Sequence, residues 1–74
     1  MNKSHHNIIL ECLFVHGPLG KDGISRKTNL DVNQCSRALP ILQREGFVEL
    51  TGRTVLSDSK RPEREWRLCH AKHT

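Results

Sequence analysis

The sequence predicts an α+β fold in which three helices are followed by a two-stranded β-hairpin. Apolar residues recur at helical spacing up to residue 46 and alternate in two short runs after it, and residues 57–62 between those runs are rich in turn-forming side chains. A chain of 74 residues has room for one small domain. We therefore expect a single domain over residues 1–74, with an ordered core at about 5–69 and a frayed tail at 70–74.

The first helix is predicted from the most apolar stretch of the chain, residues 8–15. Periodicity alone does not separate a buried helix from a strand over this length. Ser4 is a suitable N-cap and His16-Gly17-Pro18 ends the segment, so we favour a helix from about Ser4 to His16. Such a helix would place Ile9, Cys12, Leu13 and His16 on one face, with Ile8 and Val15 beside it.

A short second helix is predicted from Lys21 to Thr28, with Ile24 facing the core. Gly23 lowers its stability by roughly 1 kcal/mol relative to alanine, so the helix depends on tertiary support. Asn29 follows it, and asparagine suits the left-handed conformation that commonly ends a helix.

The third helix has the clearest start and end signals. Asp31 with Gln34 three residues later is a variant of the capping box. Gly46 suits the position just past the end, after which Phe47 can fold back on Leu42. Between these signals the residues that recur at helical spacing and define an apolar face are Cys35, Ala38, Leu39 and Leu42.

Pro40 opposes this helical pattern. A proline inside a helix removes one hydrogen bond and crowds the preceding turn, at a cost of about 3 kcal/mol. We therefore expect a bend, or a locally irregular helix, near Ser36–Pro40.

After Gly46 the apolar period changes from that of a helix to that of a strand. Val48 and Leu50 fall on one side of the first run. In the second run Trp66 and Leu68 fall on one side, with Glu65, Arg67 and Cys69 on the other. This pattern predicts a β-hairpin with a long basic loop that carries Lys60, Arg61 and Arg64, and with Trp66 as a buried anchor beneath it.

This order of elements resembles the winged helix-turn-helix superfamily of bacterial and phage transcription regulators. The resemblance is carried by ISRKTNL at residues 24–30, by RAL at 37–39, by residues 42–48 and by the basic hairpin that ends in Trp66-Arg67-Leu68. It covers residues 8–69, nearly the whole chain. It implies sequence-specific binding of double-stranded DNA, with the third helix in the major groove and a basic wing on the DNA backbone.

Polar residues of the third helix are the expected base readers. When the apolar face turns inward, Asn33, Gln34 and Arg37 lie largely on other faces. Asparagine and glutamine can pair bidentately with adenine, and arginine with guanine. The expected contacts with the DNA backbone are Ser25, Arg26, Lys27, Arg44, Lys60, Arg61 and Arg64. Ordinary solvated charge, and protection of an exposed hairpin edge, are the alternatives for these residues.

Composition agrees with a polyanionic partner. The net charge is +4, and residues 1–22 contribute none of it because Lys3 and Lys21 balance Glu11 and Asp22. The 3 cysteines are widely spaced, which is a poor disulfide framework and fits a reducing cytoplasm. The sequence has neither an apolar stretch of about 20 residues nor the pattern of a secretory signal, so we expect no membrane association.

Other functions have weaker support. Cys69, His70 and His73 form a short cluster, with His5 and His6 near the start, but the paired ligand spacing of zinc sites is missing. We therefore expect no metal and no cofactor, and no enzymatic activity, because none of the usual catalytic motifs occurs. The main alternative is a winged helix used for protein contact, as an accessory factor that docks on a larger regulator or replication protein. A homodimer through the first helix is also left open.

Overall fold

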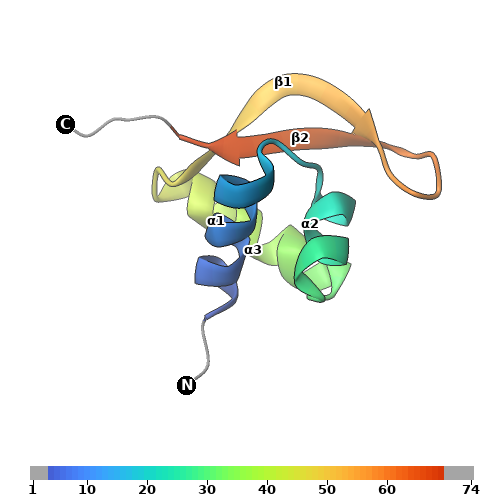
Figure 1. Cartoon of the computed structure of the whole chain (residues 1–74). Coiled ribbons are helices and arrows are strands. Elements are labelled where there is room, and N and C mark those ends of the chain that lie inside the picture. Colours follow the sequence, from blue (N-terminus) through green and yellow to red (C-terminus); the bar gives the residue numbers. More distant parts are fainter. Residues whose placement is uncertain (1–3, 70–74) are drawn as a thin grey trace.

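The computed structural model describes residues 4–69, which form three helices and a two-stranded antiparallel sheet (Figure 1). Helices α1, α2 and α3 span His5–His16, Lys21–Thr28 and Val32–Arg44. Strands β1 and β2 span Val48–Leu56 and Pro62–Leu68, and the hairpin lies across one side of the helices. The predicted α+β order is confirmed, and the arrangement is consistent with a winged-helix topology.

The helix ends agree with the local signals in the sequence. The Ser4 side chain accepts a hydrogen bond from the Asn7 backbone N–H at 3.1 Å and caps α1. Asn29 ends α2 in the left-handed conformation, with φ of 64°. Asp31 and Gln34 form the predicted capping box, in which Gln34 Oε1 accepts from the Asp31 N–H at 3.0 Å.

The end of α3 is a Schellman motif. The Phe47 N–H donates to the Leu42 carbonyl at 2.9 Å, and the Gly46 N–H donates to the Gln43 carbonyl at 3.1 Å. Gly46 has φ of 87°, a conformation that glycine adopts without strain. The chain therefore folds back as predicted, although the Phe47 side chain remains 51% exposed.

Helix α3 runs through Pro40 without interruption. The predicted irregularity near residues 36–40 does not appear as a break in the helix. The flanking turns are held in the core by Leu39 and Leu42, both 1% exposed, which explains how the helix survives the missing backbone N–H.

All three helices and both strands contribute to one core. Its buried residues are Ile9, Cys12, Leu13, Ile24, Cys35, Ala38, Leu39, Leu42, Val48 and Trp66. The apolar faces predicted for the helices are thus confirmed, except that His16, the last residue of α1, is exposed. Trp66 anchors the hairpin on the helices as predicted.

The hairpin differs from the prediction in the length of its strands. Leu50 pairs with Trp66, the register shifts between Leu50 and Thr54, and pairing then continues to Leu56 and Pro62. The loop is therefore short, at residues 57–61, and Arg64 lies on β2 rather than in the loop. The outer part of the hairpin lacks a regular alternation of buried and exposed residues, so its strands leave no two-residue period in the sequence.

A short bridge ties the hairpin to the segment between α1 and α2. The Leu19 N–H donates to the Trp66 carbonyl at 3.0 Å, and the Trp66 N–H donates to the Leu19 carbonyl at 2.8 Å. The sequence did not predict this pairing. It holds β2 close to the start of α2.

Burial of Trp66 has a direct spectroscopic consequence. Trp66 is the single tryptophan of the chain and is 9% exposed, so its native emission should be blue-shifted and poorly quenched by iodide. The measurement is a Stern–Volmer titration of native protein, with the guanidinium-unfolded protein as control. Equal quenching in the two states would contradict the position of Trp66.

Candidate nucleic-acid interface

The face of α3 opposite the core forms an exposed polar ridge. It contains Asn33, Arg37 and Arg44, which are all exposed and lie on one side of the helix at spacings of four and seven residues. We call these three residues the α3 ridge. Two of the predicted base readers and one predicted backbone contact therefore lie along the same face of α3, and an exposed helix face of this kind fits the major groove of DNA.

Gln34, the third predicted base reader, is placed differently. Its side chain is partly buried, and its Oε1 accepts the Asp31 N–H in the capping box. Bidentate pairing with adenine needs both the oxygen and the nitrogen of the carboxamide. Base reading by Gln34 would therefore compete with the cap of its own helix.

Two predicted backbone contacts on α2 have partners within the domain. The Ser25 hydroxyl donates to the Leu30 carbonyl at 2.6 Å and closes the turn between α2 and α3. Arg26 pairs with Asp58 of the hairpin loop at 2.7 Å, and lies 4.0 Å from Asp22. Their structural roles account for both residues without a ligand.

The start of α2 and the hairpin are joined by further contacts. Glu63 Oε1 accepts the Asp22 N–H at 3.1 Å, which caps a helix whose own N-cap residue, Gly20, has no side chain. A Cβ at Gly20 would lie 2.7 Å from Glu63 Oε1, so a larger residue there would displace the carboxylate that caps α2. Asp58 N–H also donates to Asp22 Oδ2 at 3.1 Å. The hairpin is thereby held in a defined position beside α2.

Two other arginines are paired on the hairpin itself. Arg53 lies 3.2 Å from Glu65, which also accepts a 2.8 Å hydrogen bond from Thr51, and Arg67 lies 2.7 Å from Glu49. Arg67 alternates with Trp66 along β2, so it belongs to the side of the strand opposite the tryptophan. These arginines carry charge that acidic neighbours already balance.

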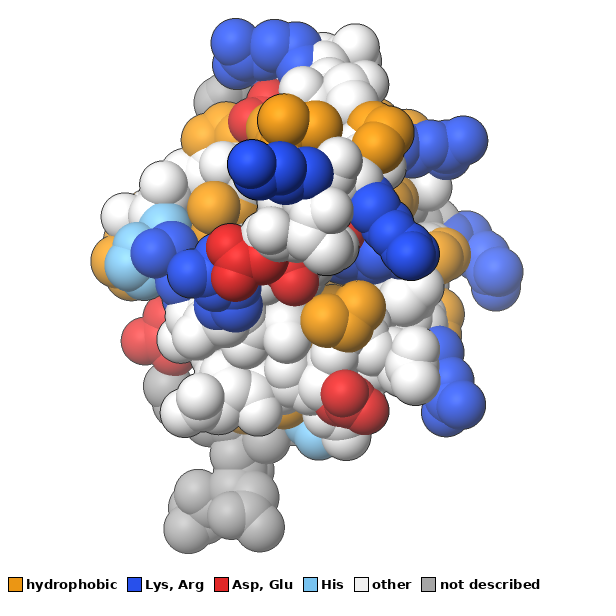
Figure 2. All heavy atoms as spheres, turned by 90° about the vertical axis from the view of Figure 1, so that its right-hand side faces the viewer, with side chains coloured by type: hydrophobic (Ala, Val, Ile, Leu, Met, Phe, Trp, Pro, Cys, Tyr) orange, Lys and Arg blue, Asp and Glu red, His pale blue; other side chains and the backbone are white. Residues whose placement is uncertain are grey.

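The remaining cations show where the excess positive charge is available. Within residues 4–69, those that form no ion pair are Lys21, Lys27, Arg37, Arg44, Lys60, Arg61 and Arg64. Figure 2 looks at the side with α2 and the hairpin loop, and shows several acidic side chains near its middle with basic side chains around them. Lys60 and Arg61 lie exposed in the hairpin loop. Lys27 instead lines a depression with Cys12 and Val15, between α1 and α2.

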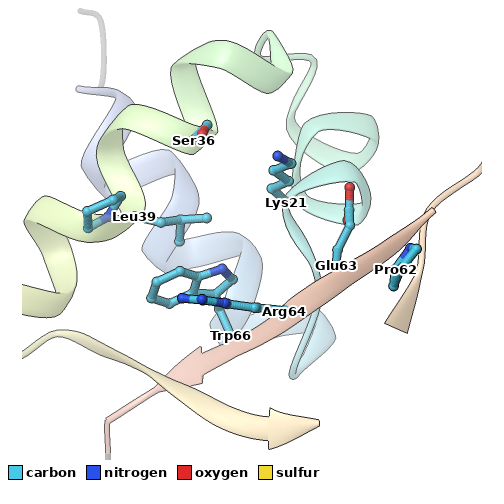
Figure 3. Close-up of a pocket in the computed structure, with 8 residues that line it drawn as sticks. Lys21, Ser36, Leu39, Pro62, Glu63, Arg64 and Trp66 are labelled. Atoms are coloured by element: carbon cyan, nitrogen blue, oxygen red, sulfur yellow. The ribbon is translucent and has the colours of Figure 1, made fainter. Parts of the chain in front are cut away.

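A cavity of about 310 Å³ lies between α3, the start of α2 and β2 (Figure 3). Its lining residues are Lys21, Ser36, Leu39, Pro40, Pro62, Glu63, Arg64 and Trp66. Lys21 was not among the predicted site residues. A signal was present, because Lys21 opens a helix and the dipole of a helix disfavours a cation there.

The thiols and histidines do not assemble a metal site in the described part of the chain. Among residues 4–69, no three His, Cys, Asp or Glu side chains gather in a way that could hold an ion. Burial raises the pKa of the Cys35 thiol to about 11, with Cys12 and Asp31 adding to the effect, and burial also raises the pKa of Cys12. Both thiols are therefore protonated at neutral pH, unlike the thiolates that bind metals. His70 and His73 lie outside the described residues.

None of the helices within residues 4–69 has the length and apolar character needed to cross a lipid bilayer.

The sequence matches no model of a known protein family and no curated protein. The fold and the surface geometry are thus the grounds on which a function is proposed.

Proposed function

We propose that this domain binds double-stranded DNA in the cytoplasm and regulates transcription, with the α3 ridge in the major groove and the hairpin on the backbone. The observation that supports this proposal is that some basic side chains of residues 4–69 form ion pairs within the domain and others do not. Arg26, Arg53 and Arg67 are neutralised by acidic partners, whereas the α3 ridge and the hairpin loop keep unpaired charge. A DNA backbone supplies the regularly spaced phosphates that such a surface attracts.

Base selection would come from the α3 ridge. Asn33 and Arg37 are four residues apart and both exposed, so they can reach neighbouring base pairs. Arginine pairs bidentately with guanine and asparagine with adenine, and each such pair provides about 1–3 kcal/mol of discrimination.

The hairpin loop would add contacts that do not depend on base sequence. Lys60 and Arg61 are exposed, while Asp58 in the same loop is tied to Arg26 and Asp22 on α2. The loop is therefore positioned before DNA arrives, and less conformational entropy is lost when Lys60 and Arg61 bind phosphate.

One set of DNA titrations distinguishes residues that contact bases from residues that contact the DNA backbone. Arg37→Ala should weaken binding to a selected duplex by about 1–3 kcal/mol and affect random duplex less, because a base contact is lost. Lys60→Ala and Arg61→Ala should weaken both duplexes about equally, and lower the slope of log affinity against log salt by about one unit. Duplexes selected from genomic fragments and random duplexes would be titrated at several salt concentrations.

Arg67→Ala is the matched control, because it removes the same charge from a residue that is already paired with Glu49. Absence of measurable affinity for any duplex at low salt would overturn the proposal. Silence of Arg37→Ala, Lys60→Ala and Arg61→Ala together would do the same.

One observation favours protein contact as a second function. Phe14 and Val15 on α1 are 79% and 64% exposed, and exposed apolar side chains of this size often mark protein interfaces. The occupant would be a second copy of the chain or a larger regulator. Light scattering over a range of protein concentrations tests the first case, and a salt-insensitive complex in the absence of DNA would favour protein contact over DNA binding.

A further inference from the structure

We propose that the cavity between α3 and β2 is a seat for one sugar–phosphate unit of the DNA strand. The phosphate would lie between Lys21 and Arg64, and the sugar against Trp66 and Pro40. This inference rests on the proposed DNA binding and names the strand contact beside the α3 ridge.

The composition of the cavity suits a group that is anionic at one end and apolar at the other. Its volume of about 310 Å³ lies at the lower end of the range for small-molecule sites, which begins near ~300 Å³. Leu39, Pro40 and Trp66 give it apolar walls, while Lys21 and Arg64 supply positive charge. Figure 3 shows Lys21 and Ser36 on neighbouring helices, across the cavity from Arg64 and Trp66 on β2.

Lys21 lies at the N-terminus of α2, where the helix dipole is unfavourable for a positive charge. It is the first residue of α2, is only partly exposed, and forms no ion pair with an acidic side chain of residues 4–69. The positive end of the helix dipole raises the energy of a cation at this position. A phosphate in the cavity would compensate Lys21 directly.

Arg64 faces the cavity from the opposite wall. It alternates with Glu63 and Glu65 along β2, which places it on the same side of the strand as Trp66. Its side chain is exposed and has no acidic partner among the described residues. A free guanidinium can bind two phosphate oxygens at once.

The acidic residue of the cavity forms no ion pair with either of these cations. Glu63 also lines it, but Glu63 Oε1 accepts the Asp22 N–H at 3.1 Å and is held at the start of α2. Across from it, Ser36 contributes a small side chain to the lining from α3. The phosphate is therefore expected between Lys21 and Arg64 on the Ser36 side of the cavity, away from Glu63.

Matched pairs of variants test whether the cavity binds the DNA backbone. Lys21→Ala and Arg64→Ala remove cations of the cavity, whereas Arg53→Ala and Arg67→Ala remove hairpin cations that are already paired with Glu65 and Glu49. Ser36→Leu would fill the cavity, and Gln43→Leu places the same side chain elsewhere on α3. Each variant would be titrated with the same duplex at several salt concentrations, while the emission of Trp66 is recorded.

We expect Lys21→Ala and Arg64→Ala each to weaken duplex binding roughly tenfold, as for the loss of one charge-assisted contact, and to lower the salt slope by about 0.9. Duplex binding should change the emission of Trp66 in the original protein, because Trp66 lines the cavity. Ser36→Leu should weaken binding and abolish this change, and the three controls should bind like the original protein. If Arg37→Ala impairs binding but the cavity variants match their controls, the seat is wrong and the proposed function stands. If neither the original protein nor any variant binds duplex DNA, both the cavity contact and the proposed function are wrong.

Free deoxynucleoside monophosphate at millimolar concentration separates the two sources of the phosphate. If the free nucleotide competes weakly with duplex, and this competition is lost in Lys21→Ala and Arg64→Ala, the cavity is a binding site for the DNA strand. A Trp66 emission change with the free nucleotide, together with unchanged duplex affinity in both variants, would overturn the strand contact and assign the cavity to a free ligand.

Discussion

Leu13→Ala should lower the free energy of unfolding by about 2–5 kcal/mol, whereas Phe14→Ala should change it by less than about 0.5 kcal/mol. The two residues are neighbours on α1, but Leu13 is 3% exposed and Phe14 is 79% exposed. Truncating Leu13 removes apolar contacts and leaves a cavity in the core, while truncating Phe14 removes a side chain that already contacts water. A domain of this size has roughly 4–11 kcal/mol of stability, at about 0.05–0.15 kcal/mol per residue, so Leu13→Ala should remove a large part of it.

Urea denaturation followed by circular dichroism, at two protein concentrations, measures both variants. A small effect of Leu13→Ala would contradict its position in the core. A large and concentration-dependent effect of Phe14→Ala would show that a second copy of the chain covers this face of α1, because a monomer has nothing there to lose.

The parts of the fold that depend on neighbouring residues could be predicted from the sequence. Ser4 and Asp31 with Gln34 mark helix starts through contacts that span three residues, and Asn29 marks a helix end through its own left-handed conformation, so their residue types are direct evidence. Once the helix ends were assigned, the faces of α1 and α3 followed from spacing, apart from His16, because burial on one side of a helix repeats every turn.

The contacts that shape the candidate interface could not be predicted in this way. Glu63 caps α2 from 41 residues away, and Arg26 meets Asp58 across 32 residues. Nothing in the local sequence selects one acidic partner from several. Arg26 was therefore expected to contact phosphate, although Asp58 occupies it, and Lys21 was overlooked, although the fold places it opposite Arg64 in the cavity.

Burial also explains the error in the hairpin. Residues 54–56 pair with residues 62–64 beside the start of α2, and these two segments show no regular alternation of buried and exposed residues. A strand gives a two-residue period only if one side is buried and the other exposed. The outer hairpin was therefore predicted as loop, and Arg64 was placed with Lys60 and Arg61 instead of on the strand beside Trp66.

Pro40→Ala should raise the free energy of unfolding by about 1–3 kcal/mol. Proline has no N–H to donate to the carbonyl of Ser36, and its ring crowds that carbonyl, so alanine restores one hydrogen bond and relieves the crowding. Pro40 is exposed, so little packing is lost. The unfolded chain regains conformational freedom, which offsets about 0.4–1 kcal/mol of the gain.

Urea denaturation tests this effect, with Gln43→Ala as control for helix propensity at another exposed position of α3. Unchanged or lower stability of Pro40→Ala would mean that the proline imposes no cost on this helix. Pro40 also forms part of the apolar wall of the cavity, so the proposed sugar contact predicts that the more stable variant binds duplex DNA more weakly. A proline that lowers helix stability can be retained because it shapes a binding surface. Unchanged DNA affinity in Pro40→Ala would contradict this explanation for Pro40.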